Sequence, residues 1–509
     1  MLILAVLPIA AILVLMVGLR WGASRAGAAG YLTAFFLARW AFGLGPRGLA
    51  YAHAKALLLT VDVLLIVWAA YLLYRVADEA GAIATIGAML PHLTADRGMQ
   101  ALIIGWAFAS FLQGVGGFGV PVAVVAPLLV GLGFSPLAAV VIPSVGHAWA
   151  VTFGSLGSSF QALLAATGRP ETQLAAPAAL FLALAGVLVG WAVLHAAEGW
   201  SALRRLWLPA LGMGGVMGAV LVVMATHGLW NIASFGAGLS GLGVGLLLAR
   251  RYRGHLQASG SALDGHALAV ALSGYAALLV ITLTVQLVPP VKAFLGRVVI
   301  SASFPEIRTA LGYVTPAGPG RRIPLFRHAG AILAYSALAA FALYRRAGLY
   351  TPGAAGRILS QTARRMMSSS VGIATMVTMA VIMQHAGMTE ALARGLAQAF
   401  GRAYPAVAPW IGALGAFMTG SNTNANVVFA ALQMRTAQLL GYAVPLILAA
   451  QTAGGAIGSV IAPTKVVVGA STGGMAGREG EVIRGLGRYV GLLLLAISLL
   501  TLLGSALGV

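Results

Sequence analysis

The fold is decided by two stretches that share one pattern, GVGGFGVPVAVVAPLLVGLGFSPLAAVVIPSVGHAWAVTFGSLG at residues 114–157 and GSNTNANVVFAALQMRTAQLLGYAVPLILAAQTAGGAIGSVIAPTKVVVGASTGG at residues 420–474. Each opens with a glycine-bearing break inside apolar sequence and runs through a short apolar segment to a Gly-Phe or Gly-Tyr turn. Each then resumes as a second short segment that ends in another break of Gly, Ser and Pro. Equal spacing after the two turns aligns Gly146 with Gly454. The chain therefore contains two copies of one interrupted-helix pattern.

The breaks point to a cavity. An interrupted helix exposes backbone amides and carbonyls, which lipid tolerates only where the break lines a cavity or is buried in protein. Short, interrupted segments at corresponding positions in two halves are typical of the binding site of a secondary transporter. The helix N-termini exposed at such breaks carry partial positive charge that suits an anion. The alternative is that the glycines only let helices pack closely, but the polar residues in the breaks favour a binding site.

Composition places the chain in a bilayer. Of 509 residues, 60% are hydrophobic and 8% charged, whereas about a quarter are charged in soluble domains. We expect an all-α integral membrane protein with about 12 to 14 transmembrane helices, including two repeats of broken or re-entrant half-helices. Residues 1–509 are expected to form one membrane domain, with approximate halves at 1–250 and 251–509. The runs that approach or exceed the ~17–25 residues needed to cross a hydrocarbon core include Met1–Leu19, Ala56–Tyr74, Ala175–His195, Leu268–Val288 and Gly487–Leu507.

The charge pattern gives an orientation. The formal charge of +20 comes from 31 basic and 11 acidic residues, and because the basic residues cluster between apolar runs, we expect no nucleic-acid partner. Two apolar runs separate each cluster from the next, so all three clusters are predicted to lie on one side, which the positive-inside bias makes cytoplasmic. The clusters are Arg204 and Arg205; Arg250, Arg251 and Arg253; and Arg345, Arg346, Arg357, Arg364 and Arg365.

The longest interruption of the apolar pattern, residues 289–327, lies outside by this alternation, although it carries several arginines. Three interpretations are open. The segment is a tolerated long loop, it folds back against the helix bundle, or it attracts anions to the outer mouth of the protein.

The densest polar cluster lies at the opening of the second stretch, residues 420–426. Its amides and hydroxyls suit a carboxylate through their donors or a cation through their oxygens, and they also suit capping of the two half-helices. Capping and binding are compatible. We predict that a substrate carboxylate binds between the two breaks, at Gly116, Gly117, Gly119, Ser421, Asn422, Thr423, Asn424, Asn426, Gln451 and Lys465.

Unpaired polar groups are costly in lipid, so His147 and Asp62 are further candidates, and Lys465 and Gln451 of the predicted site each have alternative interpretations. His147 suits a proton carrier, or it is a neutral histidine bonded to a neighbouring helix. Asp62 suits a proton site, a cation ligand or the partner of a buried base. Lys465 either neutralises an anion, pairs with Asp62 or extends from a helix end. For Gln451 the alternative to substrate binding is a bond between helices.

At the two repeats the sequence resembles the lactate permease family of bacterial transporters, within the ion transporter superfamily. The resemblance is carried by residues 116–157, by GSNTNANVVFAALQ at 420–433 and by TAGGAIGSVIAPTKVVVGAS at 452–471, and residues 304–328 are similar to the family's outer loop. The triplet Ser421-Asn422-Thr423 also resembles the motif by which the superfamily holds substrate carboxylate and sodium. Only the second repeat has this triplet, because the first has Gly116-Gly117-Phe118-Gly119.

The resemblance implies a symporter that moves small 2-hydroxymonocarboxylates, such as L-lactate, D-lactate or glycolate, with protons across the bacterial inner membrane. A proton on His147 or Asp62 would accompany the anion, and neither a cofactor nor a metal site is expected. The rival within transport is a sodium-coupled carrier of another organic anion, such as a dicarboxylate. An enzyme is not expected, because there is no Gly-x-Ser-x-Gly elbow near a base and no metal-binding histidine pair at helical spacing.

Overall fold

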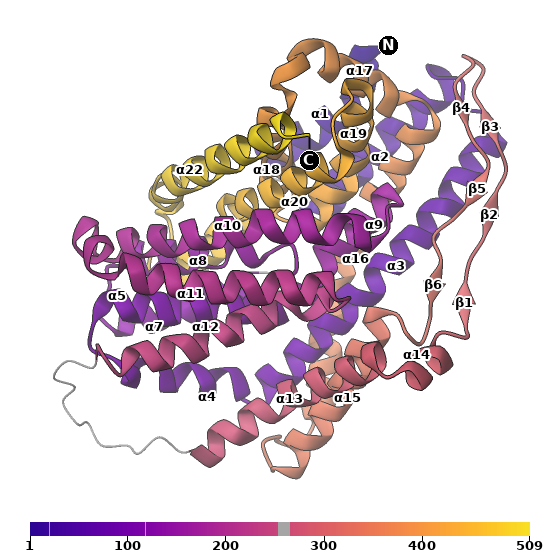
Figure 1. Ribbon diagram of the computed structural model, residues 1–509. Coiled ribbons are helices and arrows are strands. Elements are labelled where there is room, and N and C mark those ends of the chain that lie inside the picture. Colours follow the sequence, from indigo (N-terminus) through magenta and orange to yellow (C-terminus); the bar gives the residue numbers. More distant parts are fainter. Residues whose placement is uncertain (20, 118, 253–264, 509) are drawn as a thin grey trace.

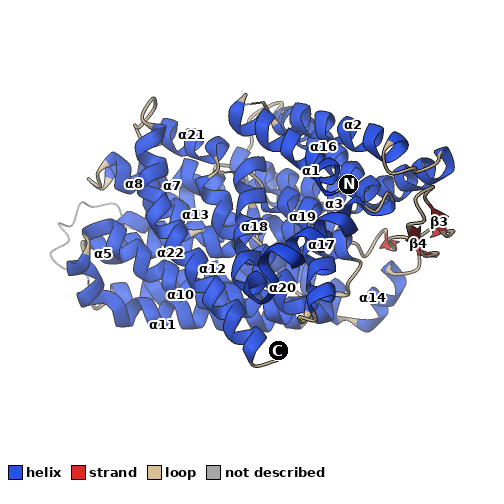
Figure 2. Ribbon diagram, turned by 90° about the horizontal axis from the view of Figure 1, so that it is seen from above, coloured by secondary structure: helices blue, strands red, loops and turns tan. Residues whose placement is uncertain are grey.

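The computed structural model describes residues 1–19, 21–117, 119–252 and 265–508. Phe118 of the first break and Arg253 of the second basic cluster therefore lie outside the described residues. The described chain is a bundle of helices with a β-ribbon at its edge (Figures 1 and 2). Ten described helices are long and apolar enough to cross a membrane, which confirms the all-α membrane class. This number is below the 12 to 14 transmembrane helices expected, and the shorter apolar helices Leu2–Met16 and Val120–Gly131 are not among the ten.

The elements before the ribbon include the whole first repeat. They are α1 (Leu2–Leu13), α2 (Ala23–Trp40), α3 (Pro46–Glu79), α4 (Ala82–Met89), α5 (Arg97–Gln100), which continues through a π-helical segment (Ala101–Phe108) into α6 (Ala109–Val115), then α7 (Val120–Gly131), α8 (Pro136–Gly146), α9 (Ser158–Thr167), α10 (Glu171–Glu198), α11 (Trp200–Thr226), α12 (Ala233–Ala249), α13 (Gly265–Leu287) and α14 (Pro289–Leu295).

The ribbon and the second repeat follow. These elements are β1 (Val299–Ile300), β2 (Ser303–Phe304), β3 (Ile307–Arg308), β4 (Val314–Thr315), β5 (Gly318–Pro319), β6 (Ile323–Pro324), α15 (Ala329–Arg346), α16 (Ala354–His385), α17 (Met388–Phe400), α18 (Tyr404–Thr419), α19 (Asn422–Leu440), α20 (Val444–Gly458), α21 (Pro463–Thr472) and α22 (Glu479–Ala506).

The two repeats pack into each other reciprocally. Helix α7, which follows the first break of the first repeat, packs on α21, which follows the second break of the second repeat. In the same way, α19 follows the first break of the second repeat and packs on α9, which follows the second break of the first repeat. The same exchange joins α8 to α22 and α20 to α10. Because each pair is matched by its counterpart, the breaks of both repeats meet at a common centre.

The aligned glycines make equivalent contacts. A Cβ atom at Gly146 would lie 2.0 Å from the carbonyl oxygen of Gly105, and a Cβ atom at Gly454 would lie 1.9 Å from that of Pro409. In both repeats, then, the helix after the turn presses against the backbone of the helix before the break. Only glycine allows this approach, as in other closely packed membrane helices.

The segment at residues 289–327 begins with α14 and continues as the ribbon, from β1 to β6, which runs along α3 (Figure 1). Its strands pair antiparallel as β1 with β6, β2 with β5 and β3 with β4. The amide of Ala310 donates to the carbonyl of Gly43 at 2.8 Å, and Arg321 reaches Asp62 in α3. Of the three interpretations of this segment, folding back against the bundle is the one observed.

Candidate anion-binding site

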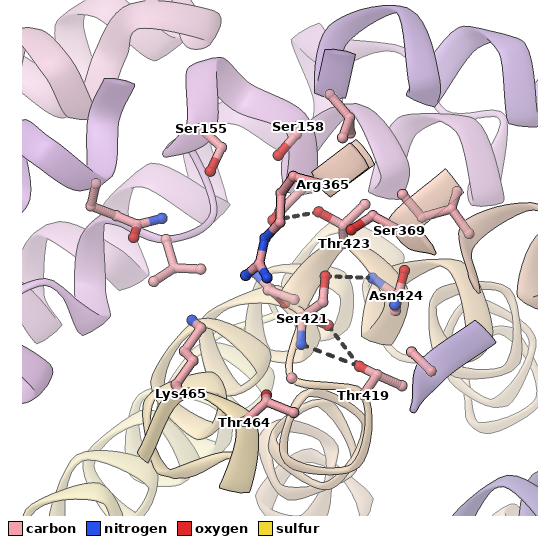
Figure 3. Close-up of a pocket in the computed structure, with 18 of the residues that line it drawn as sticks. Ser155, Ser158, Arg365, Ser369, Thr419, Ser421, Thr423, Asn424, Thr464 and Lys465 are labelled. Atoms are coloured by element: carbon pink, nitrogen blue, oxygen red, sulfur yellow. Dashed lines mark hydrogen bonds between the residues drawn. The ribbon is translucent and has the colours of Figure 1, made fainter. Parts of the chain in front are cut away.

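A cavity of about 200 Å³ lies where the breaks meet, and we call it the central cavity. Its walls come from both repeats and from α2, α3 and α16 (Figure 3). Two cationic side chains, Arg365 and Lys465, line it, and no residue of its described lining is an aspartate or a glutamate. The other polar residues of the lining are Gln113, Ser155, Ser158, Ser159, Ser369, Thr419, Ser421, Asn422, Thr423, Asn424 and Thr464.

Four helix N-termini face the central cavity. Helices α2, α9 and α19 begin at Ala23, Ser158 and Asn422, and α21 begins one residue before Thr464; each of these four residues belongs to the lining. The first amides of a helix have no partner within the helix and carry partial positive charge. Together with the two side-chain cations, they make the cavity a site for an anion.

The break before α19 is held by its own residues. Gly420 adopts a φ of +70°, a conformation that costs glycine little. The hydroxyl of Ser421 then accepts a hydrogen bond from the amide of Asn424 at 3.3 Å, which is the N-cap arrangement. Ser421 therefore both caps α19 and lines the cavity, as the two compatible interpretations of this cluster allow.

The polar cluster of the second repeat divides between the cavity and the helix contacts behind it. Ser421, Asn422, Thr423 and Asn424 line the cavity, whereas Asn426 lies outside the lining and donates to the backbone oxygen of Ser159 at 2.9 Å. Asn422 also donates to the hydroxyl of Thr152 in the first repeat, at 3.1 Å. The side-chain oxygens of Asn422, Asn424 and Asn426 are buried and accept no hydrogen bond from any described residue.

In the first repeat, Ser155 lines the cavity, whereas the sequence predicted that glycines would do so. Gly116, Gly117 and Gly119 lie beside the cavity and are absent from its lining. The hydroxyl of Ser155 donates to the carbonyl of Gly116 at 3.4 Å, and a Cβ atom at Gly117 would lie only 1.8 Å from that hydroxyl. The glycines thus make room for Ser155.

The segment around Ser155 is strained. Ser155 and Leu156 have φ values of +47° and +53°, the only positive values among described residues other than glycine. Non-glycine residues held in this region are typical of ligand sites, where the surrounding structure holds them in place.

The structure identifies hydrogen-bond partners for Lys465 and Gln451, which the sequence alone did not determine. The ammonium of Lys465 donates to the hydroxyl of Ser459 at 2.9 Å; it does not pair with Asp62, which was one of the alternatives. Gln451 is fully buried and lies outside the cavity lining. It accepts a hydrogen bond from Gln433 at 2.8 Å, so it joins helices behind the site.

His147 has one free ring nitrogen. It follows α8 directly as the C-terminal capping residue, and its Nδ1 lies 2.6 Å from the carbonyl oxygen of Pro143. Since a carbonyl only accepts hydrogen bonds, Nδ1 carries the hydrogen and Nε2 has the lone pair. Nε2 is buried and has no hydrogen-bond partner among described residues. The acceptor lone pair of His147 is therefore unused by any described residue.

Asp62 lies away from the central cavity, in a network with the ribbon. Its buried carboxylate accepts hydrogen bonds from Gln161 at 2.6 Å, from Arg321 at 2.7 Å and from His328 at 3.0 Å. Asp62 lines a second cavity, of about 190 Å³, which we call the ribbon-side cavity. The base that pairs with Asp62 is thus Arg321.

The sequence did not identify Arg365 as a site residue. The charge pattern places it in a cytoplasmic basic cluster with Arg364; because α16 begins at Ala354, Arg365 lies in the fourth turn of this helix. The signal available in the sequence was an arginine pair placed well inside a helix. Ser155, Ser158 and Ser159 were missed as well, although they lie at the end of the first quoted stretch.

Comparisons with known proteins found sequence similarity along nearly the whole chain. The sequence model described as L-lactate permease matches residues 1–508. The L-lactate permease of Bacillus subtilis (strain 168) is 28% identical, over 85% of this chain and 82% of the relative. The glycolate permease GlcA of Escherichia coli (strain K12) is 27% identical, over 95% of this chain and 91% of the relative.

A solved structure supports the fold. The crystal structure of the Alcanivorax borkumensis YdaH transporter, reported to have an unusual topology, superposes with a TM-score of 0.50 at 16% sequence identity. The superposition covers 92% of this chain and 90% of that one. At this identity the likeness concerns the fold alone.

Proposed function

The chain belongs to the L-lactate permease family, and from that premise we propose that it is a proton symporter for small 2-hydroxymonocarboxylates. The substrates proposed are L-lactate, D-lactate and glycolate. Membership of this family makes the chain a multi-pass transporter of the bacterial inner membrane and not an enzyme. The substrate class rests on the central cavity together with the relatives, which are an L-lactate permease and a glycolate permease.

The observation that carries the proposal is a cavity with two cations, four helix N-termini and no described acidic residue. We assign the substrate carboxylate to Arg365, Lys465 and the first amides of α19, and the 2-hydroxyl group to the neighbouring Ser and Asn side chains. The cavity measures about 200 Å³, which is below the roughly 300–1,000 Å³ of pockets for drug-sized ligands. A molecule with a few carbon atoms fits this size.

Proton coupling has an energetic reason. Moving a lone anion into a negative interior costs about 2.3 kcal/mol per 100 mV, and a proton that travels with the anion cancels this cost. We assign the proton to Nε2 of His147, because its lone pair accepts no hydrogen bond from any described residue and is available to a proton. Asp62 is the weaker candidate, since all its described contacts are donors that stabilise the charged carboxylate.

Alternating access follows from the intertwined repeats. The cavity is bounded by helix tips from both repeats, so a shift of one repeat-bearing unit against the other opens it to one side at a time. We propose that the moving unit carries the broken helices of one repeat and shifts against the rest of the chain.

The test is uptake of labelled L-lactate into proteoliposomes, in sodium-free buffer, with an inward proton gradient. We expect accumulation above the external concentration, and we expect a protonophore to abolish it. Equal internal and external lactate in the presence of the gradient would contradict proton symport.

One observation favours a second function, the sodium-coupled carrier. The three buried amide oxygens of Asn422, Asn424 and Asn426 have no described donor, and hard cations prefer oxygen ligands. Uptake that appears only when sodium is added to the same proteoliposomes would establish this alternative.

A further inference from the structure

The positive charge that lines the ribbon-side cavity exceeds the negative charge of the carboxylates in the same lining. Four cationic side chains line it, from α14 and the base of the ribbon: Lys292, Arg321, Arg322 and Arg327. Its two acidic residues are Asp62, which pairs with Arg321, and Glu171, which accepts a hydrogen bond from the indole of Trp230 at 2.5 Å.

Three of the four cations have no counterion. Lys292, Arg322 and Arg327 form no ion pair with any acidic residue that the structure describes. Arg327 is half-buried, while Lys292 and Arg322 are exposed. Like charges that share one hollow repel each other, so an anion bound between them lowers the free energy of the site.

The two cavities share walls. On α3, Val67 lines the central cavity, and Asp62, about 7.5 Å away along the helix axis, lines the ribbon-side cavity. On α9, Ser158 and Ser159 face the central cavity, whereas Gln161 faces the other. The 2.6 Å hydrogen bond between Gln161 and Asp62 therefore joins α9 to α3 in the wall of the ribbon-side cavity.

We propose that the ribbon-side cavity is a second carboxylate site, which binds the same small monoanion at the mouth of the pathway before it reaches the central cavity. Lys292, Arg322 and Arg327 hold the carboxylate. In the orientation predicted from the basic clusters this mouth is periplasmic. The inference deepens the proposed function and rests on its substrate class.

Equilibrium dialysis of the purified full chain with labelled L-lactate tests the proposal. We expect two bound lactates per wild-type chain and one in the variant Arg322→Gln/Arg327→Gln. The matched control, Arg308→Gln/Arg402→Gln, removes the same charge from exposed positions outside both cavities and should keep two. The variant Arg365→Gln should lose the central site and keep the outer one.

Transport gives a second readout. Arg322→Gln/Arg327→Gln should raise the KM for uptake about three- to tenfold at low ionic strength, and the effect should shrink as salt screens the charges. Unchanged stoichiometry and affinity in this variant would overturn the second site and leave the proposed function intact. Lactate binding to neither site of the wild type would refute the substrate class, and the second site with it.

Discussion

The two repeats share a framework and differ in chemistry. Both place a glycine, Gly146 or Gly454, against the backbone of the preceding helix, and both send a half-helix into the other repeat. At the first break, however, the second repeat presents the side chains of residues 421–424 to the central cavity, whereas the corresponding glycines of the first repeat, Gly116, Gly117 and Gly119, are absent from its lining. Ser155, from the later break of the first repeat, lines the cavity beside them. His147 has Gly455 as its counterpart in the alignment.

This difference separates two tasks. The symmetric framework makes a hollow with helix N-termini around it, and this requires only glycine at the contact points. In the proposed mechanism, side chains that differ between the copies place substrate contacts in the second repeat and the proton in the first. The four predictions below test that division.

The largest effect is expected from the shared glycines. Gly146→Ala and Gly454→Ala should each destabilise the protein by roughly 1–3 kcal/mol or more and abolish transport, because the added methyl group meets a backbone carbonyl. Thermal unfolding in detergent measures the first effect. Gly212→Ala in α11, where nothing lies within 4 Å, is the control and should be neutral or stabilising. Tolerance of alanine at only one of the two aligned positions would break the equivalence of the repeats.

The second effect concerns coupling. His147→Ala should abolish accumulation driven by a proton gradient and leave lactate exchange across the membrane, because only the proton carrier is lost. His385→Ala is a matched control, since the buried His385 also bonds through Nδ1 to a backbone carbonyl, that of Val381, at 2.9 Å. Concentrative uptake by the His147→Ala variant would show that His147, and with it the first repeat, does not carry the coupled proton.

The third effect concerns substrate affinity. Arg365→Gln should lower kcat/KM for uptake about 10- to 100-fold, the usual effect of losing a hydrogen bond to a charged group. Arg364→Gln, one residue away on α16 and absent from the cavity lining, should change it little. Equal effects of the two substitutions would mean that general charge, and not the site, decides uptake.

The smallest effect compares the breaks directly. Asn422→Ala should raise the KM about 2- to 10-fold. Ser155→Ala should raise it less, because the Ser155 hydroxyl already donates to the carbonyl of Gly116. An unchanged KM for Asn422→Ala would mean that the second-repeat cluster only caps its helix. A larger effect of Ser155→Ala would mean that the first repeat, and not the second, makes the main substrate contacts.

Local patterns explain which features the sequence predicted. The breaks, the turn glycines and the 420–426 cluster follow from residues close together in the chain, because helix caps and left-handed turns are made by neighbours. The alignment of Gly146 with Gly454 also came from spacing alone. These features locate the central cavity and most of its second-repeat lining.

Long-range partners explain what the sequence did not predict. Asp62 pairs with Arg321, 259 residues later, and no local pattern distinguishes this arginine from Arg322. Arg365 enters the cavity because α16 packs against α2, α3 and α19, a tertiary arrangement that composition does not encode. The position of Gln451 behind the site depends in the same way on its contact with Gln433.

The pairing of Asp62 also sets an order of events during synthesis. Helix α3 leaves the ribosome long before Arg321, and at about 5–20 residues per second the 259-residue interval lasts roughly 10–50 s. During this time α3 enters the bilayer with a lone aspartate, at a cost of roughly 2.5–3.5 kcal/mol. The rest of its 34 residues, with a mean hydropathy of 2.4 over the best 18-residue window, offsets that cost. The ribbon then closes over a helix that is already inserted.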